Sequence, residues 1–142
     1  MINFMNLTPL LTDNISEILT LLIEFTQTRQ KILIRNITNS HITGFMPKEL
    51  EVDEFSKLLN FAIDEHIRTQ RLVLYDTKNI KFGPNGELDV TPIDDALGKE
   101  LMEDNLDEYF ELQIKKLWEN SLNQKVAAEL LKQKKDMLSV NH

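Results

Sequence analysis

Apolar residues recur every three or four positions in two long segments, one at each end of the chain, and this spacing predicts helices. In the first segment, from about residue 12 to 36, Asn14 and Glu17 have the spacing of an N-terminal capping pair. Behind them runs a seam of coiled-coil type in which Arg29 fills the one charged position. The seam residues are Ile15, Ile18, Leu22, Phe25 and Ile32. Leu33 lies off the seam, so the helix is apolar on more than one side.

The last segment, about residues 106–138, carries apolar residues on two faces. The first face holds Leu106, Phe110, Ile114, Leu117, Ala128 and Leu131, and the second holds Leu122, Val126, Leu130 and Met137. Lysines near its end suit a helix C-terminus, where the helix dipole favours cations. Each end helix has more apolar surface than one partner helix covers, which indicates burial against other subunits. The alternative is that both helices simply pack on each other and on the middle of the chain.

The middle region, residues 37–105, begins where helical signals stop. Asn, Thr and Ser side chains between residues 36 and 43 compete for backbone hydrogen bonds, and Gly44 can take a positive φ. A second helix is predicted from about residue 53 to 69. Its apolar face holds Phe55, Leu58, Leu59, Ala62, Ile63 and Ile67.

Further along the middle region, residues 72–76 are β-prone. Residues 80–82 and 88–90 flank a Gly-Pro-Asn-Gly turn and predict a small hairpin. Thr91 and Pro92 predict the cap and first turn of a short helix over 93–103. The fold class predicted is therefore mainly α, in one domain. Two long terminal helices pack as a coiled-coil-like pair, with a middle amphipathic helix and a small β-hairpin.

Composition narrows the function classes. The 142 residues carry a net charge of −7 and include no cysteine. An acidic chain is not expected to bind nucleic acid or an anionic membrane surface. Without cysteine there is no disulfide and no thiolate ligand. No apolar run approaches the roughly 20 residues that span a bilayer, and the N-terminal residues lack the features of a Sec signal. Taken alone, this predicts a cytoplasmic protein with no membrane insertion, and export without a cleaved signal stays open.

Candidate chemistry is weak along the chain. His41, His66 and His142 do not have ligand spacing, so no metal or cofactor is predicted. Acidic pairs at 94–95, 103–104 and 107–108 could act as acid and base if their environments separated their pKa values. Solvated helix faces and helix starts account for them better. We therefore predict no catalytic residue and no small-molecule substrate.

Residues 28–45 carry an ordered motif. A helix with Arg-Gln leads into Asn-Ile-Thr-Asn-Ser and then Gly-Phe. This resembles the signature of the flagellar rod and hook protein family, in which Arg-Gln leads into Asn-Ile-Ala-Asn-Ala and then Thr-Pro-Gly-Tyr. The matching residues are Arg29, Gln30, Asn36, Ile37, Asn39, Gly44 and Phe45. Ile42 and Thr43 replace the family's Thr-Pro.

The last helix is similar to the other end of the same family, whose pattern is Glu-Asn-x-Leu-x-Tyr-Gln leading into Leu-Leu-x-x-Lys. The matching residues are Glu119, Asn120, Leu122, Leu130, Leu131 and Lys134. Gln124 stands where the family has Tyr. The resemblance covers about the first 55 and the last 35 residues.

The resemblance implies a non-enzymatic structural subunit of the basal-body rod, with a layout similar to proximal rod subunits. Such proteins leave the cytoplasm through the flagellar type III export apparatus without a cleaved signal. In the periplasm they assemble with copies of themselves and with other rod proteins into a helical tube whose inner layer is the terminal helices. Asn36 and Asn39 would then bond backbone groups where the helix ends, and Arg29 would need an acid or carbonyl partner. The alternative is a soluble helical adaptor or binding module of the export system.

Overall fold

The computed structural model describes residues 4–84 and 87–140, which form four helices and two two-stranded antiparallel sheets. The elements in chain order are α1 (Phe4–Thr38), β1 (Lys48–Glu49), α2 (Val52–Thr69), β2 (Ile80–Phe82), β3 (Leu88–Val90), β4 (Ile93–Asp94), α3 (Ala96–Asp104) and α4 (Leu106–Val140). The mainly helical fold with paired terminal helices, a middle helix and a small hairpin is as the sequence predicted.

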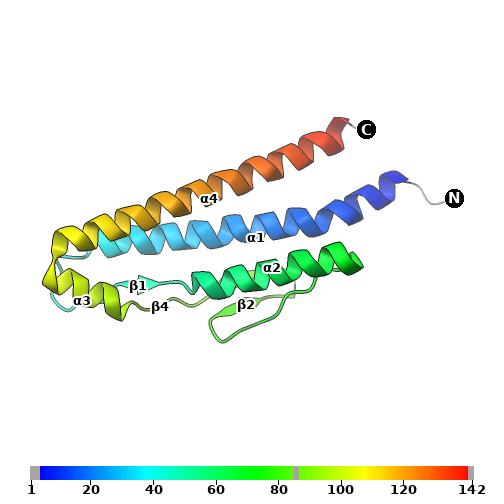
Figure 1. Cartoon of the computed structure of the whole chain (residues 1–142). Helices are drawn as coiled ribbons and strands as arrows, with labels where there is room; N and C mark the ends of the chain where they lie inside the picture. The colour runs from blue at the N-terminus through cyan, green and yellow to red at the C-terminus, as the bar shows by residue number, and fades with distance from the viewer. Residues whose placement is uncertain (1–3, 85–86, 141–142) are drawn as a thin grey trace.

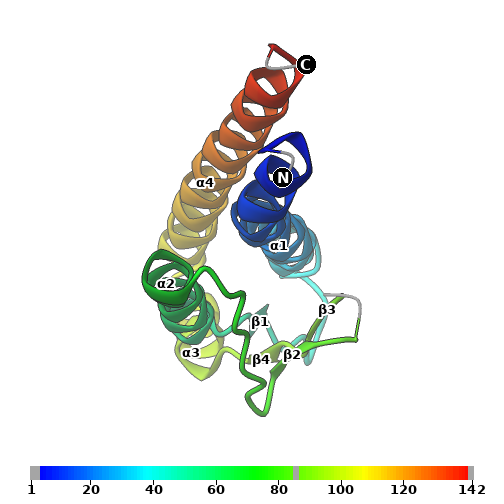
Figure 2. The ribbon, with the colours of Figure 1, turned by 90° about the vertical axis from the view of Figure 1, so that its right-hand side faces the viewer.

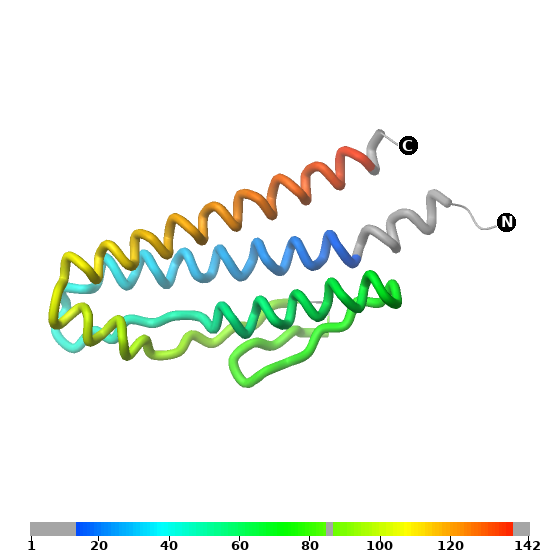
Figure 3. Tube along the Cα trace, viewed as in Figure 1, coloured from blue at the N-terminus to red at the C-terminus, as the bar shows by residue number. Residues whose placement is uncertain are grey.

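The helix α1 lies at the centre of the molecule, between α4 on one side and α2 with the strands on the other (Figure 1). α1 and α4 have 35 residues each, a length of about 52 Å, and they run antiparallel. In Figure 2, α2 and the β2–β3 hairpin both lie below the α1–α4 pair, with α2 on the left and the hairpin on the right. Figure 3 shows α4 diverging from α1 toward the end of α4. α1 therefore has neighbours on both sides, whereas α4 packs against α1 along its length and against α3 near its own start.

The apolar core lies between α1, α2 and the hairpin. It comprises Ile18, Leu21, Phe25, Leu50, Phe55, Leu58, Leu59, Ala62 and Ile80. The rings of Phe25 and Phe55 stack with centroids 3.9 Å apart. The predicted seam of α1 belongs to this core, since its other members Ile15, Leu22 and Ile32 pack against it. The seam thus faces the middle region rather than α4.

The face that α4 turns toward α1 is mostly polar. Its buried residues are Tyr109, Gln113, Asn120 and Ala127. The two apolar faces predicted for this helix are largely outside: Leu106, Ile114, Leu122, Val126, Leu130 and Met137 are between 43% and 65% exposed. Phe110, Leu117 and Leu131 are half-buried and Ala128 is exposed. Tyr109, Gln113 and Asn120 of α4 are turned toward hydrogen-bonding groups of Asn36 and Thr26 on α1.

The start of α1 was predicted wrongly. The helix begins at Phe4 rather than near residue 12, so Asn14 is inside the helix and does not cap it. The Asn14 amide nitrogen instead donates to Gln70 O at 3.1 Å and lies 3.2 Å from His66 Nδ1. An apolar residue stands at every seventh position through Phe4, Leu11, Ile18, Phe25 and Ile32. That repeat extends the helical pattern upstream of the apparent capping pair.

The start of the short acidic helix was also predicted wrongly. Ile93 and Asp94 form β4, which pairs antiparallel with β1. The helix α3 then starts at Ala96, and its cap is Asp95, whose carboxylate accepts a hydrogen bond from Gly98 N at 2.9 Å. A Cβ at position 98 would collide with that carboxylate, so the capping geometry requires glycine there.

Other middle elements follow the prediction with small differences. β2 pairs with β3 as expected for the hairpin, although residues 85–86 of its turn lie outside the described residues. Gly44 has a φ of +79°, as predicted. Residues 72–76 form no strand. The apolar face of α2 is buried at Phe55, Leu58, Leu59 and Ala62, but Ile67 is 69% exposed.

Candidate functional site

The end of α1, the strand β1 and the first half of α4 meet at a buried polar junction centred on Asn36, which is 1% exposed. The Asn36 amide nitrogen donates to Lys48 O at 2.8 Å, and Lys48 N donates to Asn36 Oδ1 at 3.0 Å. The side chain of Asn36 therefore pairs with β1 as a neighbouring strand would. This confirms the prediction that Asn36 bonds backbone groups where α1 ends.

α4 contributes two buried side chains to the same junction. Tyr109 Oη donates to Asn36 O at 2.7 Å, and Asn36 Nδ2 lies 3.1 Å from Gln113 Oε1. Burial raises the pKa of Tyr109 to about 12, and the negative charge of Asp95 adds to that shift. The junction thus adds directional hydrogen bonds to the contact between α4 and α1.

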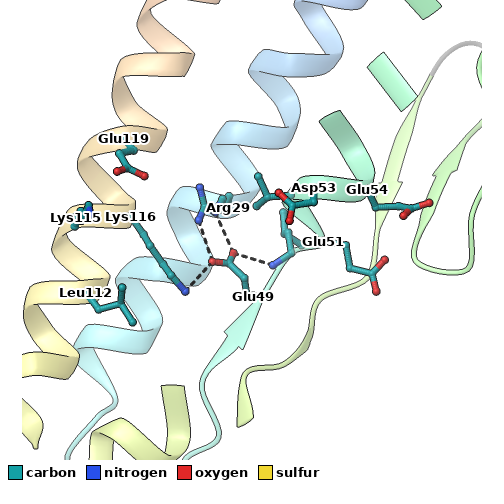
Figure 4. A pocket seen from close by; sticks show the side chains of 11 residues that line it. Arg29, Glu49, Glu51, Asp53, Glu54, Leu112, Lys115, Lys116 and Glu119 are labelled. Carbon is teal, nitrogen blue, oxygen red and sulfur yellow. Dashed lines mark hydrogen bonds and ion pairs between the residues drawn. The ribbon is translucent and has the colours of Figure 1, made fainter. Parts of the chain in front are cut away.

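An ion network lies beside the junction (Figure 4). Arg29 Nε and Nη2 donate to the two carboxylate oxygens of Glu49, each at 3.0 Å. Lys116 Nζ lies 3.3 Å from Glu49 Oε2 and 3.7 Å from Asp95 Oδ2. Burial alone would raise the pKa of Glu49, but the hydrogen bonds and charge of Arg29, the Leu50 N–H and the charge of Lys116 together hold that pKa below 4.5. The network confirms that Arg29 has an acidic partner.

The loop between α1 and β1 places the rest of the first motif. Asn39 takes part through its backbone, donating to Arg35 O and accepting from Ile42 N, each at 3.0 Å. No side-chain hydrogen bond of Asn39 is seen among the described residues, so the predicted side-chain role is not found there. Phe45 is half-buried and its carbonyl accepts from Lys99 Nζ at 2.7 Å, which ties the loop to α3.

The remaining motif residues separate into those that point inward and those that point outward. Asn120 is buried, and its amide nitrogen donates to Thr26 O at 2.7 Å. Ile37, Leu131, Lys134 and Gln30 are half-buried, whereas Glu119, Leu122 and Leu130 are exposed. The structure thus joins Arg29 and Asn36 of the first motif to the α1–α4 interface, where Asn120 of the second motif also lies.

Sequence reasoning missed Glu49, Tyr109, Gln113 and Lys116. None of them belongs to either motif. The three on α4 had one signal, a polar residue at the spacing 109, 113, 116, 120 within an otherwise mixed helix, and a polar repeat is ordinarily a solvated face. Glu49 on β1 had no such signal. The acidic pair at 94–95 has structural partners here: Asp94 forms an ion pair with Lys48, and Asp95 caps α3.

A second candidate surface lies on the outer side of α4. Ile114, Trp118, Leu122, Val126 and Leu130 repeat every four residues and are 43% to 65% exposed. We call these five residues the α4 stripe. A stripe of this kind extends over about 24 Å of helix. Contiguous exposed apolar surface of this extent is typical of an interaction site.

The described residues contain no group of three or more His, Asp or Glu side chains that could hold a metal ion. Among the helices of residues 4–84 and 87–140, none combines the length and the apolar character of a membrane span.

No protein-family model, no curated protein and no solved structure matches the chain.

Proposed function

We propose that the chain is a structural, non-enzymatic subunit of the bacterial flagellar basal-body rod, of the type of the proximal rod protein FlgB. The α4 stripe is the observation that carries this proposal. In the folded chain one face of α4 is bonded to α1, and the five residues of the stripe lie away from that face, 43% to 65% exposed. Exposed apolar surface is stabilised when a neighbouring subunit covers it.

The hydrogen-bonded junction around Asn36 provides a second argument for the same proposal. A subunit that transmits torque in a tube needs terminal helices held at a fixed angle and register. The hydrogen bonds of Asn36, Tyr109, Gln113 and Asn120 fix that register through directional contacts. Asn36 and Asn120, which make these contacts, and Arg29, which lies in the ion network beside them, are residues on which the resemblance to rod and hook proteins rests.

The test is a pair of matched variants in the bacterium that carries the gene. Leu122→Asp with Val126→Asp places two charges in the α4 stripe, and Ile67→Asp places a charge on an exposed apolar residue of α2. Deleting the gene should abolish motility and leave basal bodies without a complete rod. The unchanged gene and the Ile67 variant should restore both, and the stripe variant should restore neither while keeping the helical content and Tm of the unchanged protein. Motility without the gene would contradict the proposal.

Limited proteolysis separates this proposal from the adaptor alternative. A subunit that has not yet met its neighbours should lose the second half of α4 first, because within residues 121–137 only Ala127 is buried. Cleavage within residues 15–36 should be slow, since that part of α1 lies in the core. An adaptor that covers the stripe in a defined dimer would protect α4 to its end and run as one small oligomer in ultracentrifugation.

A further inference from the structure

The outer face of α4 is asymmetric about the α4 stripe. On one flank lies a groove of about 680 Å³ between α4 and the first turn of α2 (Figure 4). On the other flank lie the exposed lysines Lys125 and Lys132. At about 100° per residue, these two lysines are turned about 120° and 140° from Glu119, which lines the groove. The two flanks of one helix therefore present different surfaces.

The groove is acidic once its internal ion pairs are taken into account. Arg29 is paired with Glu49, and Lys116 is paired with Glu49 and Asp95, so these two cations meet two carboxylates. The remaining charged lining residues are four acids and one cation: Glu51, Asp53, Glu54 and Glu119 against Lys115. The lining is largely charged and the groove is open to solvent, unlike the apolar, enclosed sites that hold small molecules. A basic protein surface suits it better.

We propose that the groove receives the Lys125 and Lys132 flank of α4 from a second copy of this chain, lying alongside in the same orientation. This inference rests on the proposed function and names which surfaces of neighbouring subunits meet. Residues 121–137 carry four lysines against two acids and are mostly exposed in the single chain. The charges of the two flanks are therefore complementary, and the stripe between them supplies the apolar contact.

The proposed contact implies a fixed axial offset between neighbouring copies, and it does not close into a ring. Lys132 lies thirteen positions beyond Glu119, so the second copy must be shifted by about 20 Å along the helix axis to bring these residues together. The groove and the lysine flank are different surfaces, so the contact is heterologous. A heterologous contact with a translation does not close on itself and builds a staggered row of subunits, as a tube wall requires.

Charge reversal with rescue tests the contact on the full-length purified chain. Asp53→Lys with Glu119→Lys reverses the groove, and Lys125→Glu with Lys132→Glu reverses the flank. All four side chains are exposed, so both variants should keep the fold. Each variant alone should self-associate at least tenfold more weakly than the unchanged chain at low salt, measured by sedimentation equilibrium.

An equimolar mixture of the two variants should recover the association, because each copy then finds one complementary partner on each side. Asp64→Lys with Lys57→Glu, on exposed positions of α2 outside the groove, is the control and should change nothing.

Cross-linking provides a second measurement. Because the chain has no cysteine of its own, a maleimide reagent reacts only with the cysteines that are introduced. A Glu119→Cys copy mixed with a Lys132→Cys copy should give a heterodimer with a short bismaleimide, several times more than Glu119→Cys mixed with Lys135→Cys. Variants that associate as the unchanged chain does, or a mixture that does not recover, would overturn this contact. If the stripe variant still abolished association in that case, the proposed function would stand. Equal yields from both cysteine pairs would also overturn the contact.

Discussion

α1 and α4 have the same length and run side by side, yet they use their apolar residues in opposite ways. In α1 the apolar seam is inside, packed against α2 and the hairpin, with Ile18 4% exposed and Phe25 2% exposed. In α4 polar residues are inside, and the apolar stripe is outside with Trp118 65% exposed. Helix α1 therefore holds the single chain together, whereas α4 carries apolar surface that the single chain leaves uncovered. The comparison shows that an apolar pattern predicts a covered face without telling whether the same chain covers it.

The largest expected effect tests the comparison directly. Phe25→Ala removes a ring that is 2% exposed and stacks on Phe55, and should lower the free energy of unfolding by about 3–5 kcal/mol. Trp118→Ala removes a larger ring from the exposed stripe and should change the unfolding free energy by less than about 0.5 kcal/mol. Urea unfolding of the isolated protein followed by circular dichroism measures both. A destabilisation of similar size in the two variants would mean that α4 is packed like α1, and would break the comparison.

The next effect concerns the polar contact between the two helices. Asn36→Leu leaves Lys48 N, Lys48 O and Gln113 Oε1 without the bonds they now make. Unsatisfied buried polar groups cost about 1–3 kcal/mol each, so a loss of about 3 kcal/mol is expected after partial relaxation. Asn39→Leu is the matched control from the same motif, and should cost much less because no side-chain bond of Asn39 is seen among the described residues. Equal losses would show that the junction does not depend on the Asn36 side chain.

The difference between α1 and α4 also shows which features of the fold could be predicted from the sequence and which could not. The position of α2, the hairpin and the start and length of α4 follow from local apolar spacing and turn residues, and were predictable. The orientation of α4 was not, because Tyr109, Gln113 and Asn120 look like a solvated face until the partners on α1 are known. In the candidate site, Arg29 and Asn36 were recognisable through a motif. Glu49 and Gln113 act through contacts 20 and 77 residues away in the chain, and no local pattern reports those.

A smaller effect, which depends on pH, separates the ion network from the apolar core. Arg29→Met leaves Glu49 without its bidentate partner, and should cost about 2 kcal/mol at pH 7, less than a fully buried pair because both side chains keep some contact with water. Since the folded-state pKa of Glu49 is lowered below 4.5, its stabilising contribution is present above pH 4.5 and is lost as the pH falls through the folded-state pKa. The difference between the unchanged chain and the variant should therefore shrink in acid. The cost of Phe25→Ala should not follow this pH dependence, and a difference for Arg29→Met that stays constant from pH 7 to pH 3 would argue against the ion pair.

The smallest expected effect tests whether the hydrogen bond of the Tyr109 hydroxyl helps to hold α4 against α1. Tyr109→Phe keeps the buried ring and removes only the hydroxyl that donates to Asn36 O, so the expected cost is about 1 kcal/mol at pH 7. The folded-state pKa of Tyr109 is raised to about 12 from 10. Its neutral form therefore stabilises the fold fully below pH 10, and this contribution is lost as the pH rises through 12. The unchanged chain should lose stability over that range more steeply than the Phe variant, so their unfolding free energies should converge in alkali.

Tyr75, which is 54% exposed, provides the control: Tyr75→Phe should leave the alkaline profile unchanged. Profiles that stay parallel for the Tyr109 variant would mean that its hydroxyl is not held between the two helices, and that apolar contact rather than hydrogen bonding orients α4.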